Sequence, residues 1–226
     1  MSSAIIGFGA VGQALARAFA RKNLQVAVAA RRPPEAIAPQ ATAIGPTVTA
    51  HSLQDALRAE IVILAVPFGL QDELAQAADW HGKIVIDATN AYGVSLDELG
   101  GLPSSVVNAQ ALAGSRLVKA FNHLPARTLA QDPNVKGGRR VTFLSSDDDG
   151  AALQVAALVE QLGFAPRQPR QARRGRFTRP GARAHLGSAD LPGFGQVRLA
   201  RSRGGVTTRP TSVSNNVRFP DAGKSI

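Results

Sequence analysis

Short apolar runs alternate with amphipathic segments along the first 166 residues of the chain. The runs are rich in β-branched side chains, which favour strands, whereas the segments between them repeat apolar positions at helical spacing. Predicted strands cover residues 3–6, 24–29, 61–66, 83–88, 106–107, 117–121 and 140–144. Predicted helices cover residues 11–21, 53–59, 70–78, 125–130 and 147–162. Strands that alternate with helices indicate an α/β fold with a doubly wound parallel sheet.

Several predicted elements carry signals at their ends. Ser52 is the expected N-cap of the segment 53–59. Ser146 is the expected N-cap of the last predicted helix, whose first turn carries three aspartates that suit the positive end of the helix dipole. Gly163 follows that helix, as a C-terminal glycine does. The run 61–66 is almost continuously apolar, which is typical of a central strand buried on both faces.

A glycine-rich loop follows the first predicted strand and opens the first predicted helix. Its pattern is G-x-G-x-x-G. The first glycine permits a tight turn, the second lets the backbone approach a pyrophosphate, and the third lets helix and strand pack closely. Free N–H groups at the helix start would bind the phosphates, and a glycine-rich turn without a ligand is the alternative. The expected cofactor-binding residues of this Rossmann-type domain are Gly7, Phe8, Gly9, Ala10, Val11 and Gly12.

Two arginines follow the second predicted strand, where NAD-binding domains of this type carry an acidic residue for the ribose 2′-hydroxyl. Arg31 and Arg32 stand there instead, directly before two prolines. Guanidinium groups bind a 2′-phosphate through charge-assisted hydrogen bonds, so we expect NADP(H) rather than NAD(H). Arg31 is the stronger candidate, and Arg32 either binds beside it or lies over the adenine ring. A solvated basic turn is the alternative.

The ends of two further strands should face the same crevice, because ligands of such sheets bind beyond the carboxyl ends of the strands. Ala65, Val66 and Pro67 end one strand, and Asn90 follows another. We expect these residues to line the nicotinamide ribose and count them as cofactor-binding. Ordinary strand-to-helix loops are the alternative, and Asp87 can be interpreted as a loop-capping carboxylate.

Residues for acid–base or metal chemistry are sparse. The four histidines lack metal-ligand spacing, so we expect no metal site. His123 is the one histidine that follows a predicted strand and could face the crevice, and a surface or locally bonded histidine is the alternative. Tyr92 is the only tyrosine, which argues against the Tyr/Lys catalysis of many Rossmann reductases. We therefore name no catalytic residue.

Composition excludes several classes of protein. The chain has 226 residues and no cysteine, which rules out a disulfide framework, a thiolate zinc site and a cysteine nucleophile. No apolar run approaches the roughly 20 residues that cross a bilayer. The first residues also lack the pattern of a secretory signal. We expect a cytoplasmic protein without a membrane partner.

Several segments resemble one known family. The stretches AIIGFGAVGQALARAFA, AARRPPEA, IVILAVPF, IVIDATNAYG, NAQALAGSRLVKAFNHLPA and LVEQLGFAP are similar to those of the NADP oxidoreductases that depend on coenzyme F420, a deazaflavin. The resemblance covers residues 1–166 almost continuously. It implies an enzyme that transfers hydride between NADP(H) and a deazaflavin or flavin-type acceptor. It also implies that Asn122 and His123 lie on the substrate side, near that acceptor.

The implied chemistry fits the lack of acid–base residues, because hydride passes directly between two rings that the protein holds face to face. We expect residues 1–166 to form an NADP-binding Rossmann domain whose partner is a small-molecule redox acceptor. A dinucleotide-binding or sensor protein without turnover is the alternative, if the acceptor-side C-terminus is missing. A homodimer is left open.

Residues 167–226 depart from the family pattern. Residues 1–166 carry 13 Lys/Arg and 14 Asp/Glu, whereas residues 167–226 carry 13 and 2, so the formal net charge of +10 belongs to this tail. Its content of Arg, Gly, Pro, Ser and Thr shows no strand or helix period. The composition predicts an irregular basic tail of low order.

Two interpretations of the tail differ in their consequences. One is an RNA- or DNA-binding arm that uses the arginines within 173–176 and 201–203. The other is a frameshift, because the codons of residues 167–176, read one base later, permit V-N-L-G-K-L-A-E-G-G, and those of 189–198 permit L-I-F-Q-D-L-V-K-F-D. Both strings are typical of a helix-forming C-terminus. We favour the frameshift and expect no nucleic-acid partner; sequencing the gene across codons 163–170 tests this.

Overall fold

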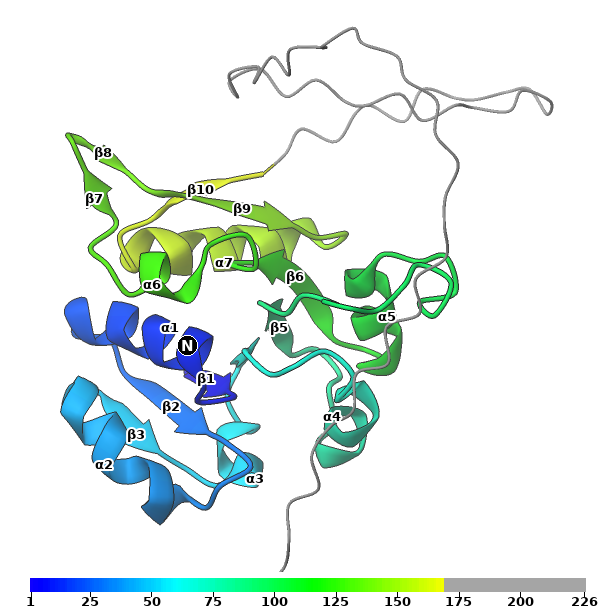
Figure 1. The fold of residues 1–226 in the computed structure, drawn as a ribbon, viewed down its shortest axis with the longest axis horizontal. Helices are drawn as coiled ribbons and strands as arrows, with labels where there is room; N and C mark the ends of the chain where they lie inside the picture. The colour runs from blue at the N-terminus through cyan, green and yellow to red at the C-terminus, as the bar shows by residue number, and fades with distance from the viewer. Residues whose placement is uncertain (169–226) are drawn as a thin grey trace, which may run out of the picture. The chain divides into compact units, whose positions relative to one another are not determined.

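The computed structural model describes residues 1–168, which form ten strands and seven helices (Figure 1). The strands are β1 (Ser3–Ile6), β2 (Val26–Ala29), β3 (Val48–Ala50), β4 (Ile61–Leu64), β5 (Ile84–Asp87), β6 (Arg116–Ala120), β7 (Asn134–Val135), β8 (Gly138–Arg139), β9 (Val141–Ser145) and β10 (Ala165–Arg167). The helices are α1 (Ala10–Arg21), α2 (Pro34–Ile44), α3 (Leu53–Ala56), α4 (Gln71–Ala77), α5 (Ser104–Ala111), α6 (Ala126–Leu129) and α7 (Asp149–Gln161).

Eight of the strands form one sheet, in the order β10-β9-β6-β5-β4-β1-β2-β3. Its six strands from β3 to β6 are parallel and follow the strand order of the Rossmann fold. β9 is antiparallel to β6, and β10 is parallel to β9, so the sheet has a mixed edge. The prediction of a Rossmann-type, doubly wound sheet is therefore confirmed.

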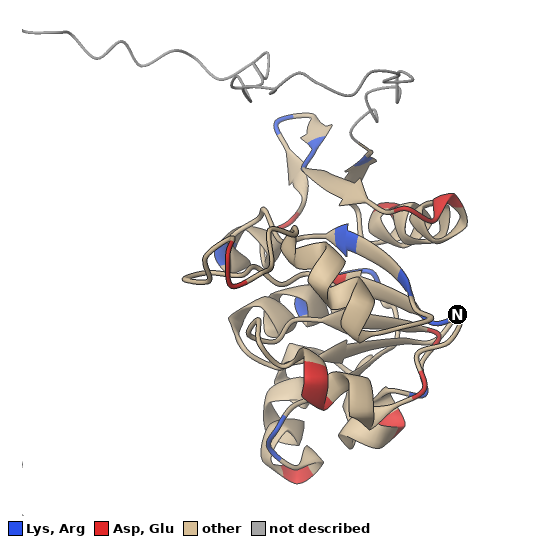
Figure 2. Cartoon of the chain, turned by 90° about the vertical axis from the view of Figure 1, so that its right-hand side faces the viewer, with Lys and Arg blue, Asp and Glu red and all other residues tan. Residues whose placement is uncertain are grey.

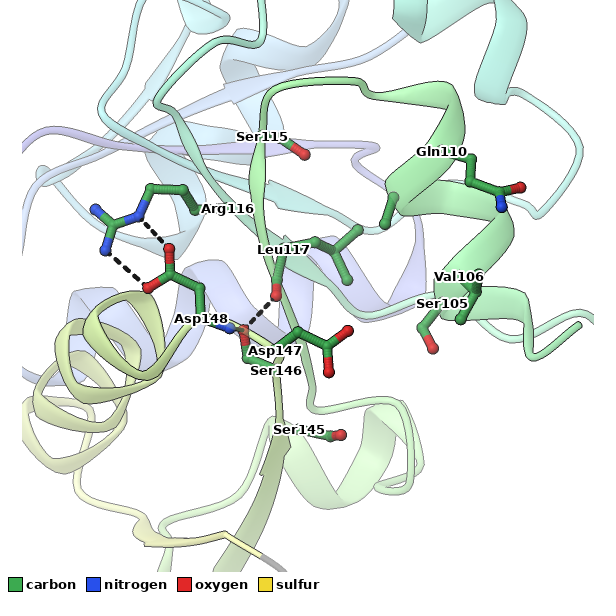
Figure 3. A pocket seen from close by; sticks show the side chains of 11 residues that line it. Ser105, Val106, Gln110, Ser115, Arg116, Leu117, Ser145, Ser146, Asp147 and Asp148 are labelled. Carbon is green, nitrogen blue, oxygen red and sulfur yellow. Dashed lines mark hydrogen bonds and ion pairs between the residues drawn. The ribbon is translucent and has the colours of Figure 1, made fainter. Parts of the chain in front are cut away.

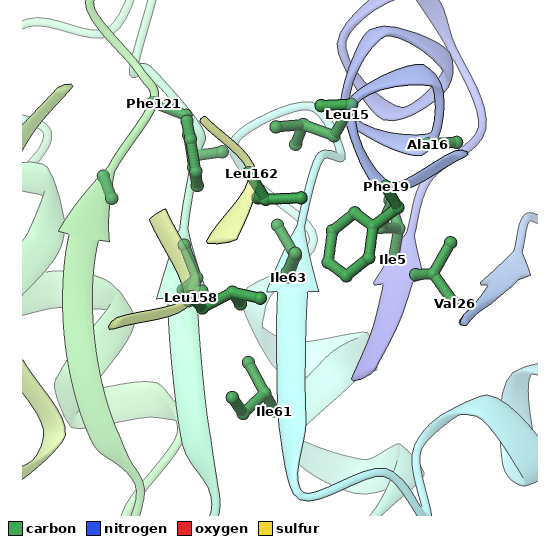
Figure 4. Close-up of a cluster of buried hydrophobic side chains, with 14 of the residues drawn as sticks. Ile5, Leu15, Ala16, Phe19, Val26, Ile61, Ile63, Phe121, Leu158 and Leu162 are labelled. Atoms are coloured by element: carbon green, nitrogen blue, oxygen red, sulfur yellow. The ribbon is translucent and has the colours of Figure 1, made fainter. Parts of the chain in front are cut away.

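Helices cover both faces of the sheet because its central strands are apolar on both sides. All residues of β1 and β4 are buried. On one face, Phe19 of α1 and Leu162 after α7 cluster with Ile5 and Ile63 (Figure 4). On the other face, a second cluster includes residues of α3 and α4 and the buried Trp80. Each buried side chain of this size stabilises the fold by about 2 kcal/mol.

Several segments differ from the sequence-based prediction, including the short strands β7, β8 and β10, which were not predicted. Residues 34–50, for which no element was predicted, form α2 and β3, and Pro34 occupies the first helical turn, where proline is tolerated. The prediction of a strand at Val106 and Val107 is wrong, because both lie in α5. β5 and β6 are parallel neighbours, so the chain between them must cross over, and such a crossover is usually a helix. This requirement outweighs the strand preference of two adjacent valines.

The observed N-cap differs from the predicted one at one helix, α7. The Ser52 N-cap of α3 is confirmed, because its side chain accepts a hydrogen bond from a backbone N–H of the first turn. Ser146 is not the N-cap of α7; Asp148 is, and it accepts from the N–H of Ala151 at 2.8 Å. Ser146 instead accepts from the N–H of Asp148 at 3.1 Å. Gly163, with a φ of +92°, follows the end of α7 as expected.

Residues 169–226 lie outside the described part of the chain, so the predictions for the tail stay predictions. The ribbon in Figure 2 is coloured by residue type and shows acidic and basic residues spread over the described part of the chain. Within residues 1–168, no helix combines the length and apolar character that crossing a membrane requires.

Candidate functional site

Gly7 turns the chain sharply between β1 and α1. Its φ of +100° lies in the left-handed region that favours glycine, and its N–H donates to the Ala29 carbonyl of β2 at 2.8 Å. A Cβ at this position would overlap the carbonyl oxygen of Ala65, which follows β4. The turn and the neighbouring strand end therefore both require glycine here.

Gly9 and Gly12 meet different constraints in the same loop. A Cβ on Gly12 would overlap the carbonyl oxygen of Gly7, so this glycine lets α1 pack against the end of β1. A Cβ on Gly9 would meet no atom within 4 Å, so the backbone there is open to an approaching ligand. The first turn of α1 carries no acidic side chain, and its N–H groups have no partners within the helix. The loop therefore fits a pyrophosphate.

The glycine loop opens into a cavity of about 720 Å³ at the carboxyl ends of β1, β2 and β4. Its volume is in the range of cofactor sites. The predicted site residues that line it are Gly7, Phe8, Gly9, Arg31, Arg32, Ala65, Val66 and Pro67. Those outside its lining are Ala10, Val11, Gly12, Asn90, Asn122 and His123. The cavity thus joins the predicted pyrophosphate loop to the predicted 2′-phosphate arginines.

The two arginines after β2 have different partners. Nη2 of Arg31 lies 3.6 Å from Oε2 of Glu73, in the first turn of α4. Both side chains are mostly exposed, so this ion pair is weak. Nη2 of Arg32 donates to Oε1 of Gln40 on α2 at 3.3 Å. Glu73 also lines the cavity, and sequence analysis missed it. The sequence feature that could have indicated it is an acidic residue shortly after the segment 65–70, which reaches the crevice.

Asn90 and Asn122 hold each other at the ends of β5 and β6. Nδ2 of Asn90 donates to the carbonyl oxygen of Asn122 at 2.8 Å, and Nδ2 of Asn122 donates to Oδ1 of Asn90 at 3.1 Å. Nδ2 of Asn90 also donates to the Tyr92 hydroxyl at 3.1 Å. The reciprocal pair fixes two neighbouring loops to one another on the predicted substrate side.

His123 follows this pair and contacts β9. Its Nε2 lies 3.4 Å from the carbonyl oxygen of Val141, and its ring centroid lies 5.2 Å from that of Phe143. Partial burial lowers the pKa of the imidazole below its ordinary value of 6.5, and the hydrogen bond to Val141 opposes this shift. The side chain is therefore mainly neutral at pH 7, and its described contacts are with the neighbouring strand.

A second cavity, of about 410 Å³, lies between α5 and the starts of β6 and α7 (Figure 3). Nε and Nη2 of Arg116 donate to the two carboxylate oxygens of Asp148 at 2.7 and 3.0 Å. These bonds, together with the N–H of Ala151, hold the pKa of Asp148 far below its usual range. Ser146 Oγ donates to the Leu117 carbonyl at 2.6 Å. These polar groups join β6 to α7 and share no lining residue with the larger cavity.

Other side chains near the carboxyl ends of the strands were also missed by sequence analysis. Asn108 and Lys119 both donate to the buried carboxylate of Asp87. They are 21 and 32 residues from it along the chain, so no local pattern could connect them. Within residues 1–168, no group of three or more His, Cys, Asp or Glu side chains is placed to hold a metal.

The strand order and the glycine loop together define a Rossmann-type domain of the dinucleotide-binding class. The model of the family described as NADP oxidoreductase, coenzyme F420-dependent, matches residues 2–91. A solved structure of a hypothetical protein from Sinorhizobium meliloti is 42% identical, with a TM-score of 0.70, over 74% of this chain and 84% of that chain. Residues 2–91 therefore belong to the family of NADP oxidoreductases that depend on coenzyme F420, and the Sinorhizobium protein is a relative over 74% of the chain.

Two further solved structures share the fold. A protein from an Arthrobacter species, reported as an F420-dependent NADP reductase, is 24% identical over 74% of this chain and 84% of that chain, with a TM-score of 0.60. An imine reductase from Myxococcus stipitatus, in complex with NADP⁺, is 18% identical over 75% of this chain and 55% of that chain, with a TM-score of 0.53. No curated protein sequence matches the chain. Family membership places the chain among NADP-dependent oxidoreductases.

Proposed function

We propose that the protein transfers hydride between NADP(H) and a deazaflavin or flavin-type acceptor. One observation carries the cofactor part of the proposal: a single cavity joins the open glycine loop to Arg31 and Arg32. Backbone N–H groups at a helix start bind a pyrophosphate, and a guanidinium binds a 2′-phosphate. Family membership supports the same cofactor independently.

The residues of the site bind and orient the cofactor. The bound dinucleotide supplies the hydride chemistry. The loop at Gly7 and Gly9 would hold the pyrophosphate, and the segment 65–67 would line the nicotinamide ribose with backbone groups. Proximity and orientation can supply most of the rate enhancement of a direct transfer between two rings, so the proposal assigns no acid–base residue.

We place the acceptor beside the loops that carry Asn90, Asn122 and His123. These loops follow β5, which is next to β4 in the sheet, and β6, which lies on the other side of β5. Tyr92 and Phe143 lie in contact with these residues and are 86% and 52% exposed. Exposed aromatic side chains offer flat apolar surfaces that suit a planar ring system. The acceptor is therefore a planar, partly apolar small molecule in this proposal.

A second candidate function is dinucleotide binding without turnover. The match to the Sinorhizobium protein covers 84% of that chain, so part of that protein has no counterpart in the matched region of this one. If the missing part helps to hold the acceptor, NADP(H) would bind and no hydride would be transferred. This candidate shares the cofactor site with the first and differs only in the acceptor.

Two measurements test the proposal in order. Calorimetric titration of the full chain should show that NADPH binds at least roughly tenfold more tightly than NADH, since one charge-assisted phosphate contact has about that effect. Equal affinities would reject the 2′-phosphate site. NADPH oxidation is then followed with coenzyme F420, FMN and FAD as acceptors, and with no acceptor as the control. Tight NADPH binding without oxidation by any acceptor would favour the second candidate.

A further inference from the structure

A buried carboxylate lies beneath the loop that follows β5. Asp87 is fully buried, and Nζ of Lys119 donates to its Oδ2 at 2.9 Å. The same ammonium donates to the Thr89 carbonyl at 2.7 Å. The N–H and hydroxyl of Thr89 donate to Oδ1 of Asp87 at 2.9 and 2.7 Å. These four bonds hold residues 87–89 in one conformation.

Asn108 of α5 extends this group toward α4. Its Nδ2 donates to Oδ2 of Asp87 at 2.8 Å and to Oγ1 of Thr89 at 3.3 Å. Its Oδ1 accepts from Nε2 of Gln71 at 2.9 Å. Asn108 is the one buried residue of α5, a position that an apolar side chain normally occupies. An amide with partners at both its nitrogen and its oxygen stands there instead.

The two ends of this network lie on two walls of the proposed crevice. Gln71 begins α4, directly after the segment 65–70, which lines the cofactor cavity. Thr89 precedes Asn90, which is paired with Asn122 on the substrate side. Residues of both walls also line one hollow of about 10 Å³, which has room for about one water molecule, so the two walls are neighbours. Neighbouring walls of a packed interior transmit a displacement from one to the other.

A buried ion pair alone is weak evidence for a function, because apolar residues often serve folding equally well. The distinguishing feature is that the network connects the cofactor wall to the substrate wall. From this placement we infer that Asn108 is a positioning residue, which holds the segment 65–70 in register with residues 88–90 around the nicotinamide half of NADP(H). The inference rests on the proposed function. The adenosine half is assigned to Arg31, which does not contact the network.

The test compares two ligands by calorimetry on the full chain. NADP⁺ has both halves, whereas adenosine 2′,5′-bisphosphate lacks the nicotinamide half. Asn108→Leu removes the amide and keeps the branched shape and the number of non-hydrogen atoms of the side chain. It should weaken NADP⁺ binding roughly tenfold and bisphosphate binding less than about twofold, in line with the coupling between residues of one hydrogen-bond network. Gln71→Leu removes only the outer hydrogen bond and should weaken NADP⁺ binding in the same direction by a smaller factor.

A double-mutant cycle separates this role from general loosening of the fold. If the two amides act in one chain, Gln71→Leu adds nothing to the effect of Asn108→Leu on NADP⁺ binding. Gln110→Leu is the matched control, because it makes a similar substitution at an exposed position of α5 and should change neither affinity. If Asn108→Leu does not fold, the comparison of the two ligands is made with Gln71→Leu.

Each outcome decides one of the two proposals. Equal weakening of both ligands, unchanged NADP⁺ affinity or additive effects of the two substitutions would overturn the positioning role and leave the network a structural one. A wild-type chain that binds neither ligand would contradict the proposed function itself. A wild-type chain that binds NADP⁺, with variants that do not discriminate between the ligands, would contradict the positioning role only.

Discussion

The glycines of the loop after β1 meet constraints that alanine substitutions separate. Gly12→Ala places a methyl group on the Gly7 carbonyl oxygen, so we expect the free energy of unfolding to fall by about 2 kcal/mol. Gly9→Ala places its methyl in open space at a φ of −83°, which any residue adopts, so stability should fall by less than about 1 kcal/mol, the difference between glycine and alanine at an N-cap. Its NADP⁺ affinity should fall roughly tenfold, because that glycine admits the pyrophosphate. Urea unfolding and calorimetry measure both, and wild-type affinity in Gly9→Ala would place the phosphates elsewhere.

Arg31 has the clearest predicted effect on cofactor choice. Arg31→Ala should weaken NADPH binding roughly 10- to 100-fold, because a hydrogen bond to a charged group contributes about 1.5–3 kcal/mol. NADH affinity should stay within about twofold, since NADH carries no 2′-phosphate. Arg58→Ala is the control, because it also removes an exposed, ion-paired arginine but one outside the cavity lining. Equal losses of affinity for NADPH and NADH would mean that Arg31 does not bind the 2′-phosphate.

Glu73 should lower the preference for NADPH over NADH, whereas Arg31 should raise it. Its carboxylate pairs with Arg31 and lines the cavity, so it competes with a 2′-phosphate for the guanidinium. Glu73→Gln should tighten NADPH binding by roughly two- to fivefold, the range that an exposed ion pair allows, and leave NADH unchanged. Asp72→Asn, one residue away on α4 and outside the cavity lining, is the matched control. Weaker NADPH binding in Glu73→Gln would mean that the carboxylate binds the cofactor directly.

At the scale of elements, sequence patterns predict what is local and miss what is not. β1 and the glycine loop could be predicted because a strand, a turn and a helix start are encoded within ten consecutive residues. α5 could not, because Val106 and Val107 favour a strand, whereas the parallel pairing of β5 and β6 requires a crossover. Two partners of Asp87, Asn108 of α5 and Lys119 of β6, are far from it along the chain, so this part of the site appears only in the structure.

The junction between β6 and α7 should be sensitive to acid. The hydrogen bond from Arg116 lowers the pKa of Asp148 from its ordinary value of 3.8. The folded state therefore binds this proton less readily than the unfolded state, and the resulting stability is present above about pH 4 and lost as the pH falls toward the folded-state pKa. Asp148→Asn keeps a capping side chain and removes the charge, so it should lower the urea midpoint at pH 7 and approach the wild type in acid.

Two variants complete this pH comparison. Asp148→Ala also removes the cap on the Ala151 N–H, so its urea midpoint at pH 7 should lie below that of Asp148→Asn. Asp147→Asn removes a neighbouring charge that has no ion pair among residues 1–168, and its midpoint should follow the wild type at every pH. The urea midpoints of Asp148→Asn and the wild type should therefore approach each other in acid. If the difference between them stays constant, the ion pair does not cause it.

At the scale of the whole molecule, the cofactor cavity and the net charge belong to different regions. All residues that line the cavity lie between residues 6 and 74, and the buried core extends to Phe164. The excess of positive charge lies after residue 166. A charge of that sign attracts polyanions regardless of the fold that carries it. Cofactor binding and polyanion binding should therefore be separable properties of this chain.

A chain that ends after Gln168 tests this separation. It keeps the complete cavity lining and the buried core, so we expect its NADP⁺ dissociation constant to lie within about twofold of that of the full chain, as for independent regions. It should lose the salt-dependent retention on heparin that residues 169–226, with 12 Lys/Arg against 2 Asp/Glu, give the full chain. A substantial loss of NADP⁺ affinity would instead show that residues 169–226 contribute to the cofactor site. Such a contribution would contradict both the basic arm and the frameshift as descriptions of that segment, because neither assigns it a role at the cofactor.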